Sequence, residues 1–322
     1  MSKNSTKKVM ILFGKSDWKK ARPFDNKDYQ YSYEYFYSLC KNSGIQMYRA
    51  SYEWYDYEKH IFKHAWIYEG EGGRWKKVND IIPDLIYDKT KASAKVYYLK
   101  ELIREKYSFI NNLEFTKLID DKLTISFLFE KWCKKNWLLE NKNDLKKYLP
   151  KIKTKKVVLK PLIESGGRGV QILEKKDAMK KSSLGKTYLM QEFIDSSHGV
   201  PGFSKEVHDL RLVFVNDEII YAYIREPKKG SLLANLAQGG SLKIVPRGKI
   251  PKSLAPIIGH ANEIFKAFYP RVFCIDFMFD EKKRPWVVEL NSMPGLYFTP
   301  EEKTSMAMMY QKLLGLFVEA LK

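Results

Sequence analysis

Cysteine and long apolar runs are both scarce in this chain, and each scarcity excludes a class of protein. The three cysteines, Cys40, Cys133 and Cys274, are odd in number and far apart. This spacing fits neither a disulfide framework nor a metal site. The apolar run at residues 9–13 is too short for a signal-peptide core or a membrane span. We therefore expect a soluble, cytoplasmic protein without a membrane partner.

Arginine is also scarce for so basic a protein. The formal net charge is +19, yet only ten of the 57 basic residues are arginine, and the lysines are dispersed along the chain. A specific nucleic-acid interface favours clustered arginine and shows a steep salt dependence. Dispersed lysine is typical of a solvated surface, or of a protein with a pocket for anionic ligands. We expect no specific nucleic-acid partner.

The beginning of the chain has the pattern of an α/β unit. With 322 residues and 44% apolar content, the chain can bury a large core, and two or three domains are expected. The apolar run at 9–13 predicts a strand, and a polar loop follows it. A helix is then predicted to end near Gly44. Its apolar side chains fall at helical spacing: Tyr33, Phe36, Tyr37 and Cys40.

Two features of this first part carry no site in our interpretation, and a third lies where such sheets bind ligands. The tyrosines between residues 29 and 57 have base stacking as an alternative role, but their spacing favours packing of a helix on a sheet. His60 and His64 are four residues apart without an accompanying acidic ligand, which favours a surface pair. Residues 83–88 predict a later strand, and Lys89 to Lys91 follow at the strand end where open α/β sheets bind ligands.

Two apolar runs near the C-terminus predict a β-hairpin. They are separated by a charged segment with the composition of a turn. A four-residue loop places Asp280 opposite Pro285 and, farther from the turn, Asp276 opposite Glu289. Because strand side chains alternate, Asn291 points the same way as Glu289.

Asp276, Glu289 and Asn291 would then form a cluster of oxygen ligands. Two uncompensated carboxylates on an apolar hairpin cost free energy, which a bound cation removes. Carboxylate and amide oxygens favour Mg²⁺ or Mn²⁺ over zinc or copper. The alternative is an acidic pair at the sheet edge that forms salt bridges with some of the many lysines.

A glycine-rich segment lies in the middle of the chain. Lys160 ends a β-branched run, and Gly166, Gly167, Arg168 and Gly169 follow before a second strand. Such glycines let backbone amides close over an anion, while the two basic side chains supply charge. The segment is neither a P-loop nor a dinucleotide fingerprint, since the required lysine and helix are missing. It predicts a phosphate lid, with an ordinary hairpin turn as the alternative.

Polar residues also follow two later apolar segments. Residues 188–195 read as a strand with a polar end. A hairpin downstream places Asp209 and Arg211 on one face. Arg225 comes next, and Asn235 lies in an apolar, glycine-rich stretch.

Taken in order, these segments resemble the ATP-grasp superfamily, in the branch that contains glutathione synthetases and RimK-type carboxylate-amine ligases. The resemblance covers roughly residues 111–296. It depends on six motifs in sequence: Asp121-Lys122 opening a helix, Lys160 with the glycine-rich lid, Gln191-Glu192-Phe193, Asp209-Leu-Arg211, Asn235 before Gly239-Gly240, and Asp276 with Glu289-x-Asn291-x-x-Pro-Gly.

The resemblance implies an α/β (α+β) fold with three parts. Residues 1–115 would form a Rossmann-like pre-ATP-grasp domain. Residues 116–190 would form the central ATP-grasp subdomain with the lid, and residues 191–322 the C-terminal subdomain with the metal site. The substrate pocket would lie between the first domain and the ATP-grasp core.

The resemblance also implies a nucleotide site. ATP would be bound by Lys122 and Lys160 at its phosphates, by the lid residues Gly166, Gly167, Arg168 and Gly169, by Gln191, Glu192 and the Phe193 backbone at the hinge and adenine, and by Asp209 at the ribose.

Asp276, Glu289 and Asn291 would coordinate Mg²⁺ (or Mn²⁺) at the phosphates, and Arg211 and Asn235 would face the reacting centre. In one respect the chain departs from the family pattern. Members of this branch commonly carry an arginine two residues before the matching asparagine, where this chain has Leu233. Arg211, Arg225 or a lid residue would then supply the missing charge.

The implied activity is an ATP-dependent carboxylate-amine ligase. An acylphosphate would form on a small-molecule or peptide carboxylate, an amine would attack it, and ADP and phosphate would be released. The alternatives are a kinase of the same fold that phosphorylates a small molecule and a nonenzymatic nucleotide-binding protein. The residues leave open the identity of both substrates and the oligomeric state.

Overall fold

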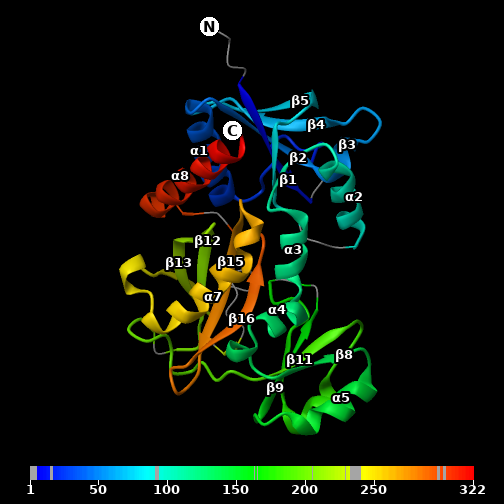
Figure 1. Ribbon diagram of the computed structural model, residues 1–322, viewed down its shortest axis with the longest axis vertical. Helices are drawn as coiled ribbons and strands as arrows, with labels where there is room; N and C mark the ends of the chain where they lie inside the picture. The colour runs from blue at the N-terminus through cyan, green and yellow to red at the C-terminus, as the bar shows by residue number, and fades with distance from the viewer. Residues whose placement is uncertain are drawn as a thin grey trace.

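The chain folds around three β-sheets that follow one another along the sequence (Figure 1). The computed structural model describes residues 6–14, 17–90, 94–162, 164, 166–204, 206–228, 230–232, 241–295, 298–299 and 302–322. A seven-stranded sheet comes first, a four-stranded sheet second and a five-stranded sheet last. The result is a mixed α/β fold, as the sequence predicted.

The seven-stranded sheet has a parallel centre and an antiparallel edge. Neighbouring strands run parallel in the order β2, β1, β6, β7, whereas β4 pairs antiparallel with β2, β3 and β5. The bounds of its strands are β1 (Lys7–Phe13), β2 (Ile45–Ser51), β3 (Tyr55–Asp56), β4 (Ile61–Tyr68), β5 (Trp75–Ile81), β6 (Leu85–Asp88) and β7 (Phe109–Ile110). Helices α1 (Lys27–Asn42) and α2 (Ala94–Arg104) accompany them.

Helix α1 forms where the sequence predicted it. The side chain of Asn26 accepts a hydrogen bond from the Tyr29 backbone N–H at 2.9 Å and so caps the first turn. Gly44 follows the last turn with a φ of 80°, a conformation that glycine adopts without strain. The expected core positions are all buried: Tyr33, Phe36, Tyr37 and Cys40.

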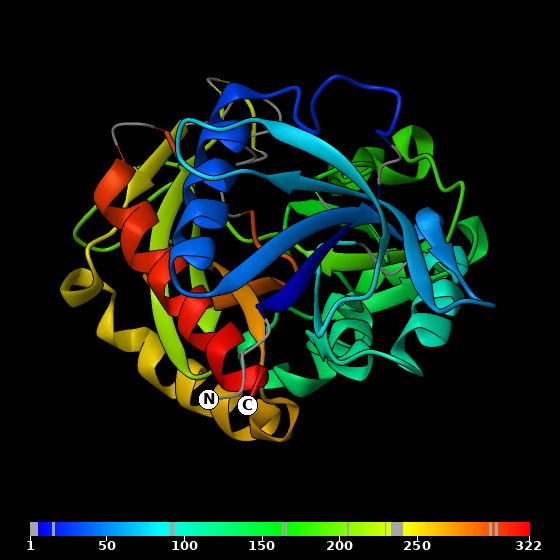
Figure 2. The same cartoon turned by 90° about the horizontal axis from the view of Figure 1, so that it is seen from above.

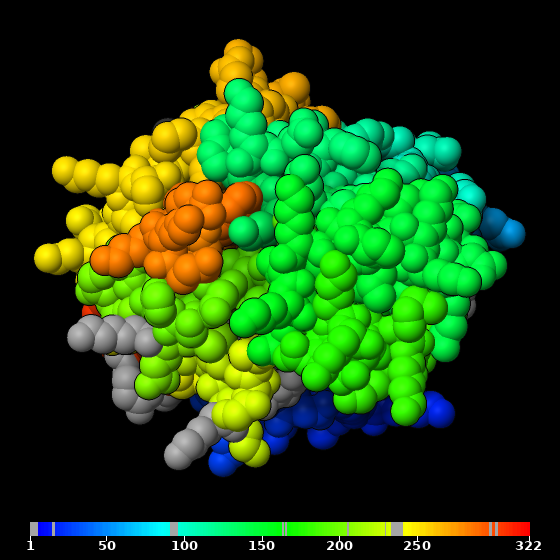
Figure 3. Space-filling view, turned by 90° about the horizontal axis from the view of Figure 1, so that it is seen from below, coloured from blue at the N-terminus to red at the C-terminus, as the bar shows by residue number. Residues whose placement is uncertain are grey.

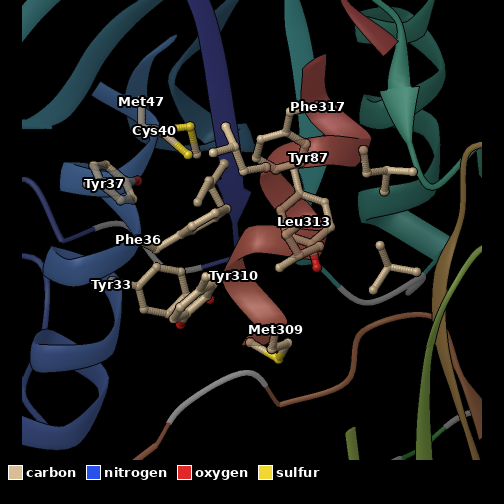
Figure 4. Packing of buried hydrophobic residues seen from close by; sticks show 14 of the residues in the cluster. Tyr33, Phe36, Tyr37, Cys40, Met47, Tyr87, Met309, Tyr310, Leu313 and Phe317 are labelled. Atoms are coloured by element: carbon tan, nitrogen blue, oxygen red, sulfur yellow. The ribbon is translucent and has the colours of Figure 1, made fainter. Parts of the chain in front are cut away.

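Helix α8 (Lys303–Ala320) returns the C-terminal end of the chain to the first sheet. It lies beside α1 in two views (Figures 1 and 2). The rings of Phe36 and Tyr310 stack with centroids 4.4 Å apart (Figure 4). Val213 and Cys274 of the five-stranded sheet belong to the same buried cluster. One apolar core therefore joins α1, α8 and two of the three sheets.

The four-stranded sheet is antiparallel throughout, in the order β10, β9, β11, β8. Its bounds are β8 (Asn136–Leu139), β9 (Lys156–Pro161), β10 (Gln171–Glu174) and β11 (Tyr188–Glu192), with helices α5 (Lys142–Tyr148) and α6 (Ala178–Lys181). Val157 and Leu159 of β9 pack in its core. Because strand side chains alternate, Val158 and Lys160 point to the opposite face.

The five-stranded sheet is also antiparallel, in the order β14, β13, β12, β15, β16. Its bounds are β12 (Asp209–Val215), β13 (Glu218–Glu226), β14 (Ser241–Ile244), β15 (Val272–Phe279) and β16 (Pro285–Asn291). Leu210 and Leu212 of β12 pack with side chains of α7 (Ala255–Phe265). By alternation, Asp209 and Arg211 point to the other face.

Two short helices connect the first sheet to the second: α3 (Leu113–Asp120) and α4 (Lys122–Leu128). Asp121 caps α4 by accepting hydrogen bonds from two backbone N–H groups, so the predicted helix start at Lys122 is present. The expected division after residue 115 falls inside α3, and the one after residue 190 falls inside β11, which pairs with β9 up to Glu192.

The cysteines and the apolar segments, both scarce in the sequence, can be located in the structure. Cys40, Cys133 and Cys274 are free thiols; Cys40 and Cys274 are buried, and Cys133 is partly exposed. No helix within the described ranges has the length and apolar character needed to cross a bilayer.

Asn111 joins the first domain to the five-stranded sheet. Its side-chain oxygen accepts from the Val272 N–H at 2.5 Å. Its amide nitrogen donates to the carbonyls of Val272 at 2.7 Å and Ser292 at 2.8 Å. Asn111 is only 1% exposed, so these hydrogen bonds are shielded from water.

Replacing Asn111 by Asp tests this joint. Asn111→Asp exchanges the donating amide for a carboxylate oxygen, so two buried carbonyls lose their donor and face negative charge. We expect the free energy of unfolding to fall by about 2–4 kcal/mol in urea denaturation. Asn112→Asp is the matched control, because Asn112 caps α3 and Asp caps helices equally well. Equal stability of the two variants would contradict the role of Asn111.

Candidate active site

The four-stranded and five-stranded sheets enclose a cavity of about 610 Å³. On the lower face of the molecule, the green domain of the four-stranded sheet lies beside the β15–β16 turn, drawn in orange (Figure 3). Tyr29 of α1 also lines the cavity. The spacing of the tyrosines in this segment indicated no site, and Tyr29 is a cavity-lining residue that the sequence pattern did not single out.

Most of the residues expected to form a site line this one cavity. They come from both sheets and their connections: Lys122, Lys160, Gly166, Gly167, Arg168, Gln191, Glu192, Phe193, Asp209, Arg211, Arg225, Glu289 and Asn291. Gly169 and Asp276 are not among the residues that line the cavity. Asn235 and Leu233 lie outside the described residues.

The glycine-rich segment is a turn between antiparallel strands that also borders the cavity. Gly166, Gly167 and Gly169 have φ values of 71°, 68° and 71°, which side-chain-bearing residues rarely adopt. A Cβ at Gly169 would also lie 2.8 Å from the Pro161 ring. Both interpretations of the segment are thus compatible with its geometry, since the hairpin turn is itself one wall of the cavity.

Two lysines of the cavity wall lie near the carboxylate of Glu289. Lys122 Nζ donates to the Glu164 carbonyl at 2.5 Å and is 3.9 Å from a Glu289 oxygen. Lys160 Nζ reaches the Val288 carbonyl at 3.4 Å. Burial lowers the pKa of Lys160 below its usual value, and Glu289 opposes that shift. Lys160 is therefore a buried cation with one weak acceptor among the described residues.

The β15–β16 hairpin places Asp276 opposite Glu289, which confirms that predicted pair. The predicted pair of Asp280 and Pro285 is wrong, because Pro285 faces Phe279. The loop is thus one residue longer than expected. A bulge of one residue in β16 restores the register before Glu289.

Side chains explain both irregularities of the hairpin. Asp280 is buried within the turn, where its carboxylate accepts from the backbone N–H groups of Lys282 and Arg284, each at 3.0 Å. The extra residue of the bulge is Val288, whose carbonyl accepts from Lys160. The bulge therefore directs a carbonyl toward the cavity lysine.

Asp276 is fully buried and is neutralised by arginine. Arg211 binds it in a bidentate manner, with distances of 2.6 and 2.5 Å, and Arg225 donates to Oδ2 at 2.7 Å. Although burial alone raises the pKa of Asp276, the two arginines hold it below its usual value. The expectation of an uncompensated carboxylate is therefore wrong for Asp276. About one of its roughly four lone pairs is left, on Oδ1.

Asp209 continues this array of charges. Its Oδ2 accepts from Arg225 at 2.5 Å, whereas its Oδ1 is buried and has no hydrogen-bond partner among the described residues. Burial raises the pKa of Asp209 to about 6, although Arg225 opposes the shift. An unpartnered acceptor in a cavity wall fits a ligand that carries a hydroxyl or N–H group.

Glu289 and Asn291 lie on the same face, as strand alternation predicted. Asn291 Nδ2 donates to a Glu289 oxygen at 3.2 Å. In the described part of the chain, no three His, Cys, Asp or Glu side chains are grouped as a metal site. The oxygens that fit a divalent ion are those of Glu289 and Asn291, with the remaining lone pair of Asp276.

The hinge residues are held by their neighbours. Glu192 accepts from the Lys153 backbone N–H at 3.1 Å, and the Phe193 N–H donates to the Thr154 hydroxyl, also at 3.1 Å. Between the sheets, apolar side chains provide surfaces suited to a planar ring: Val158, Ile172, Ile194 and Met278. The sequence pattern indicated no role for these four, although Val158 begins the motif Val158-Leu-Lys160. Strand alternation gives a signal for Val158, because it shares a face with Lys160.

Sequence and structure comparisons agree with this geometry. A family model described as the RimK-like ATP-grasp domain matches residues 124–314, more than half of the chain. The chain therefore belongs to the RimK-like ATP-grasp family, as its motifs implied, and this family uses ATP.

One curated relative is a probable α-L-glutamate ligase of Trichodesmium erythraeum (strain IMS101), 31% identical over 145 residues. The matched region is 44% of this chain and 44% of that relative. A RimK domain ATP-grasp protein of Sphaerobacter thermophilus DSM 20745 superposes with a TM-score of 0.61 at 13% identity, over 96% of this chain and 98% of that one. D-alanyl-alanine synthetase A of Vibrio cholerae O1 biovar eltor str. N16961 superposes with a TM-score of 0.65 at 11% identity, over 98% and 99%. At these identities the two structures show a shared fold.

Lys160→Met separates a binding role from a structural one. Since the ammonium is buried with one weak acceptor, its removal should not lower the melting temperature. Loss of a charge-assisted contact should weaken ATP binding about 10- to 100-fold, measured by calorimetry. Lys180→Met, an exposed lysine of the same domain, is the control. Unchanged ATP affinity in Lys160→Met would exclude a phosphate contact.

Proposed function

We propose that this protein is an ATP-dependent ligase that joins a carboxylate to an amine through an acylphosphate and releases ADP and phosphate. The observation that carries this proposal is the cavity itself, where two lysines and a glycine-rich turn face Glu289, Asn291 and two arginines. The relative named as a probable glutamate ligase supports the same reaction class.

The nucleotide would lie between the two sheets. Lys122 and Lys160 would bind the phosphates, and the turn from Gly166 to Gly169 would cover them. The base would pack between the apolar side chains beside Gln191, Glu192 and Phe193. A ribose hydroxyl would donate a hydrogen bond to Asp209 Oδ1. This assignment is supported by the burial of that oxygen and by its lack of a hydrogen-bond partner among the described residues.

Glu289, Asn291 and the free lone pair of Asp276 would hold Mg²⁺ or Mn²⁺. The ion would neutralise charge on the transferring phosphoryl group. Arg211 and Arg225 hold Asp276 in place through their ion pairs with its carboxylate. The arginines thus limit how far this carboxylate can move toward a ligand.

The chemistry follows from placing a carboxylate beside the terminal phosphate. A carboxylate oxygen attacks the γ-phosphorus, the bond to the bridging oxygen breaks, and ADP leaves with that electron pair. An amine nitrogen then attacks the acyl carbon, loses a proton, and expels phosphate. Arg211 has donors that do not contact Asp276, and it faces the cavity where the acyl group would lie. Its charge would stabilise both steps and replace the arginine expected at Leu233.

The glycine-rich turn would exclude water from the acylphosphate. Glu164 precedes this turn and is 2.8 Å from Lys186 and 3.4 Å from Arg168. These exposed ion pairs are weak, which is compatible with opening for exchange of nucleotide.

We also propose the division of the chain that the sequence implied. The parallel centre of the first sheet supports a Rossmann-like pre-ATP-grasp domain, and the other two sheets support the paired ATP-grasp subdomains. Free thiols and a requirement for ATP support a cytoplasmic enzyme.

Glu289→Gln tests the metal site. The substitution keeps the shape of the side chain and removes the charge that binds the ion, so ADP formation should fall about 100-fold or more. Glu281→Gln is the matched control, since it lies exposed in the turn of the same hairpin. Full turnover in Glu289→Gln, or activity that survives EDTA, would contradict the proposal.

A substrate screen tests the reaction class. ADP release would be measured over amino acids, short peptides and polyamines, with mass spectrometry of each product. A condensed product that needs both a carboxylate and an amine supports the ligase. A stable phosphorylated product without an amine identifies a kinase, and ATP binding without any turnover identifies a nucleotide-binding protein.

A further inference from the structure

A loop of the first domain reaches the active-site face of the five-stranded sheet. It begins at Asp88, at the carboxyl end of the parallel strand β6, where open α/β sheets bind ligands. Asp88 accepts from the N–H and the hydroxyl of Thr90 at 2.8 and 2.7 Å. Lys100, which is fully buried, contacts Asp88 at 2.6 Å and the Thr90 carbonyl at 2.8 Å. These contacts hold the loop in one conformation.

Lys89 lies between these two anchored residues. Its Nζ donates to the Pro294 carbonyl at 2.6 Å, in the segment that follows β16. Met293 and Gly295, on either side of this proline, line the cavity. Burial lowers the pKa of Lys89 to about 8, and the charge of Arg211 acts in the same direction. The contact with Pro294 therefore sets the Lys89 ammonium against a segment that borders the cavity.

Lys89 forms no ion pair in the described part of the chain, although the charge of Asp88 acts to raise its pKa. Asp88, the nearest carboxylate along the chain, is paired with Lys100. Asp209 and Asp276 are paired with Arg211 and Arg225. An ammonium has three donors, and the contact with Pro294 uses one. A partly buried cation with spare donors is costly unless an anion completes it.

The position of Lys89 indicates which anionic group it would bind, the triphosphate of ATP or a group of the second substrate. Lys122 and Lys160 lie on the four-stranded sheet side of the cavity, near Glu289. Lys89 comes from the first domain and reaches the segment that follows β16 of the five-stranded sheet. An anion between Lys89 and Arg211 would therefore be a second anionic group, separate from the triphosphate.

We propose that Lys89 binds a carboxylate oxygen of the acyl substrate, so that the first domain and Arg211 grip this substrate together. The proposal rests on the ligase function above and names the residue that recognises its carboxylate partner. The first domain would thereby contribute a residue, from the loop after β6, to the active site.

Lys89→Met and Lys89→Arg test this role in the ADP-release assay. We expect Lys89→Met to raise KM for the carboxylate substrate about tenfold or more, while KM for ATP stays within about twofold. Lys89→Arg keeps the charge and should recover most of the loss. Lys106→Met is the control, because Lys106 is an exposed lysine of the same domain. A lower melting temperature with unchanged KM would show a purely structural tie to Pro294 and overturn the proposal.

A second measurement does not depend on turnover. Acetic anhydride acetylates neutral amines, so bound carboxylate should slow labelling of Lys89 by raising its pKa. We expect L-glutamate, added with a nonhydrolysable ATP analogue, to lower labelling of Lys89 about threefold or more relative to Lys106. Labelling that glutamate and short acidic peptides leave unchanged would overturn the proposal. Absence of ADP release together with protection of Lys89 would count against the ligase reaction but not against carboxylate binding.

Discussion

The buried array of Asp209, Arg225, Asp276 and Arg211 is the constraint on which the active-site face of this protein depends. The four side chains lie on three neighbouring strands and balance two positive charges against two negative ones. Removal of one member would leave an unpaired buried charge, which typically costs about 3–5 kcal/mol. The array therefore holds the strands in register, and two of its members, Asp209 and Arg211, also line the cavity.

Strand alternation lets one sheet serve two structural purposes. One face of β12 packs with α7, whereas the other face carries charged residues at one end and apolar residues at the other. The apolar end meets α1 and α8, so the N-terminal and C-terminal helices share a core with the sheet. This packing brings Tyr29 and Lys89 of the first domain toward the active site. A substrate in the cavity would therefore contact parts of the chain that are far apart in sequence.

Some features of the site could be predicted because local rules govern them. The buried residues of helix α1 and its end follow from their spacing and from Gly44. The pair of Asp276 and Glu289 follows from hairpin geometry, although two errors cancelled. The loop was one residue longer than assumed, and a bulge at Val288 offset it. Counting residues cannot reveal a bulge, because the Asp280 contacts and the Lys160 contact that favour it depend on the folded chain.

Motif order and periodicity were sufficient for the family, for several helices and strands and for 13 of the residues that line the cavity, because these depend on residues close together in sequence. The partners of charged groups could not be predicted in the same way. Asp276 was expected to need a cation, yet two arginines from neighbouring strands neutralise it. Lys89 was expected at a strand end of the kind that binds ligands, but its contact with Pro294 exists only after the first domain packs near the five-stranded sheet. Electrostatic partners are chosen by distance in space, and spacing along a chain specifies that distance only within single helices and hairpins.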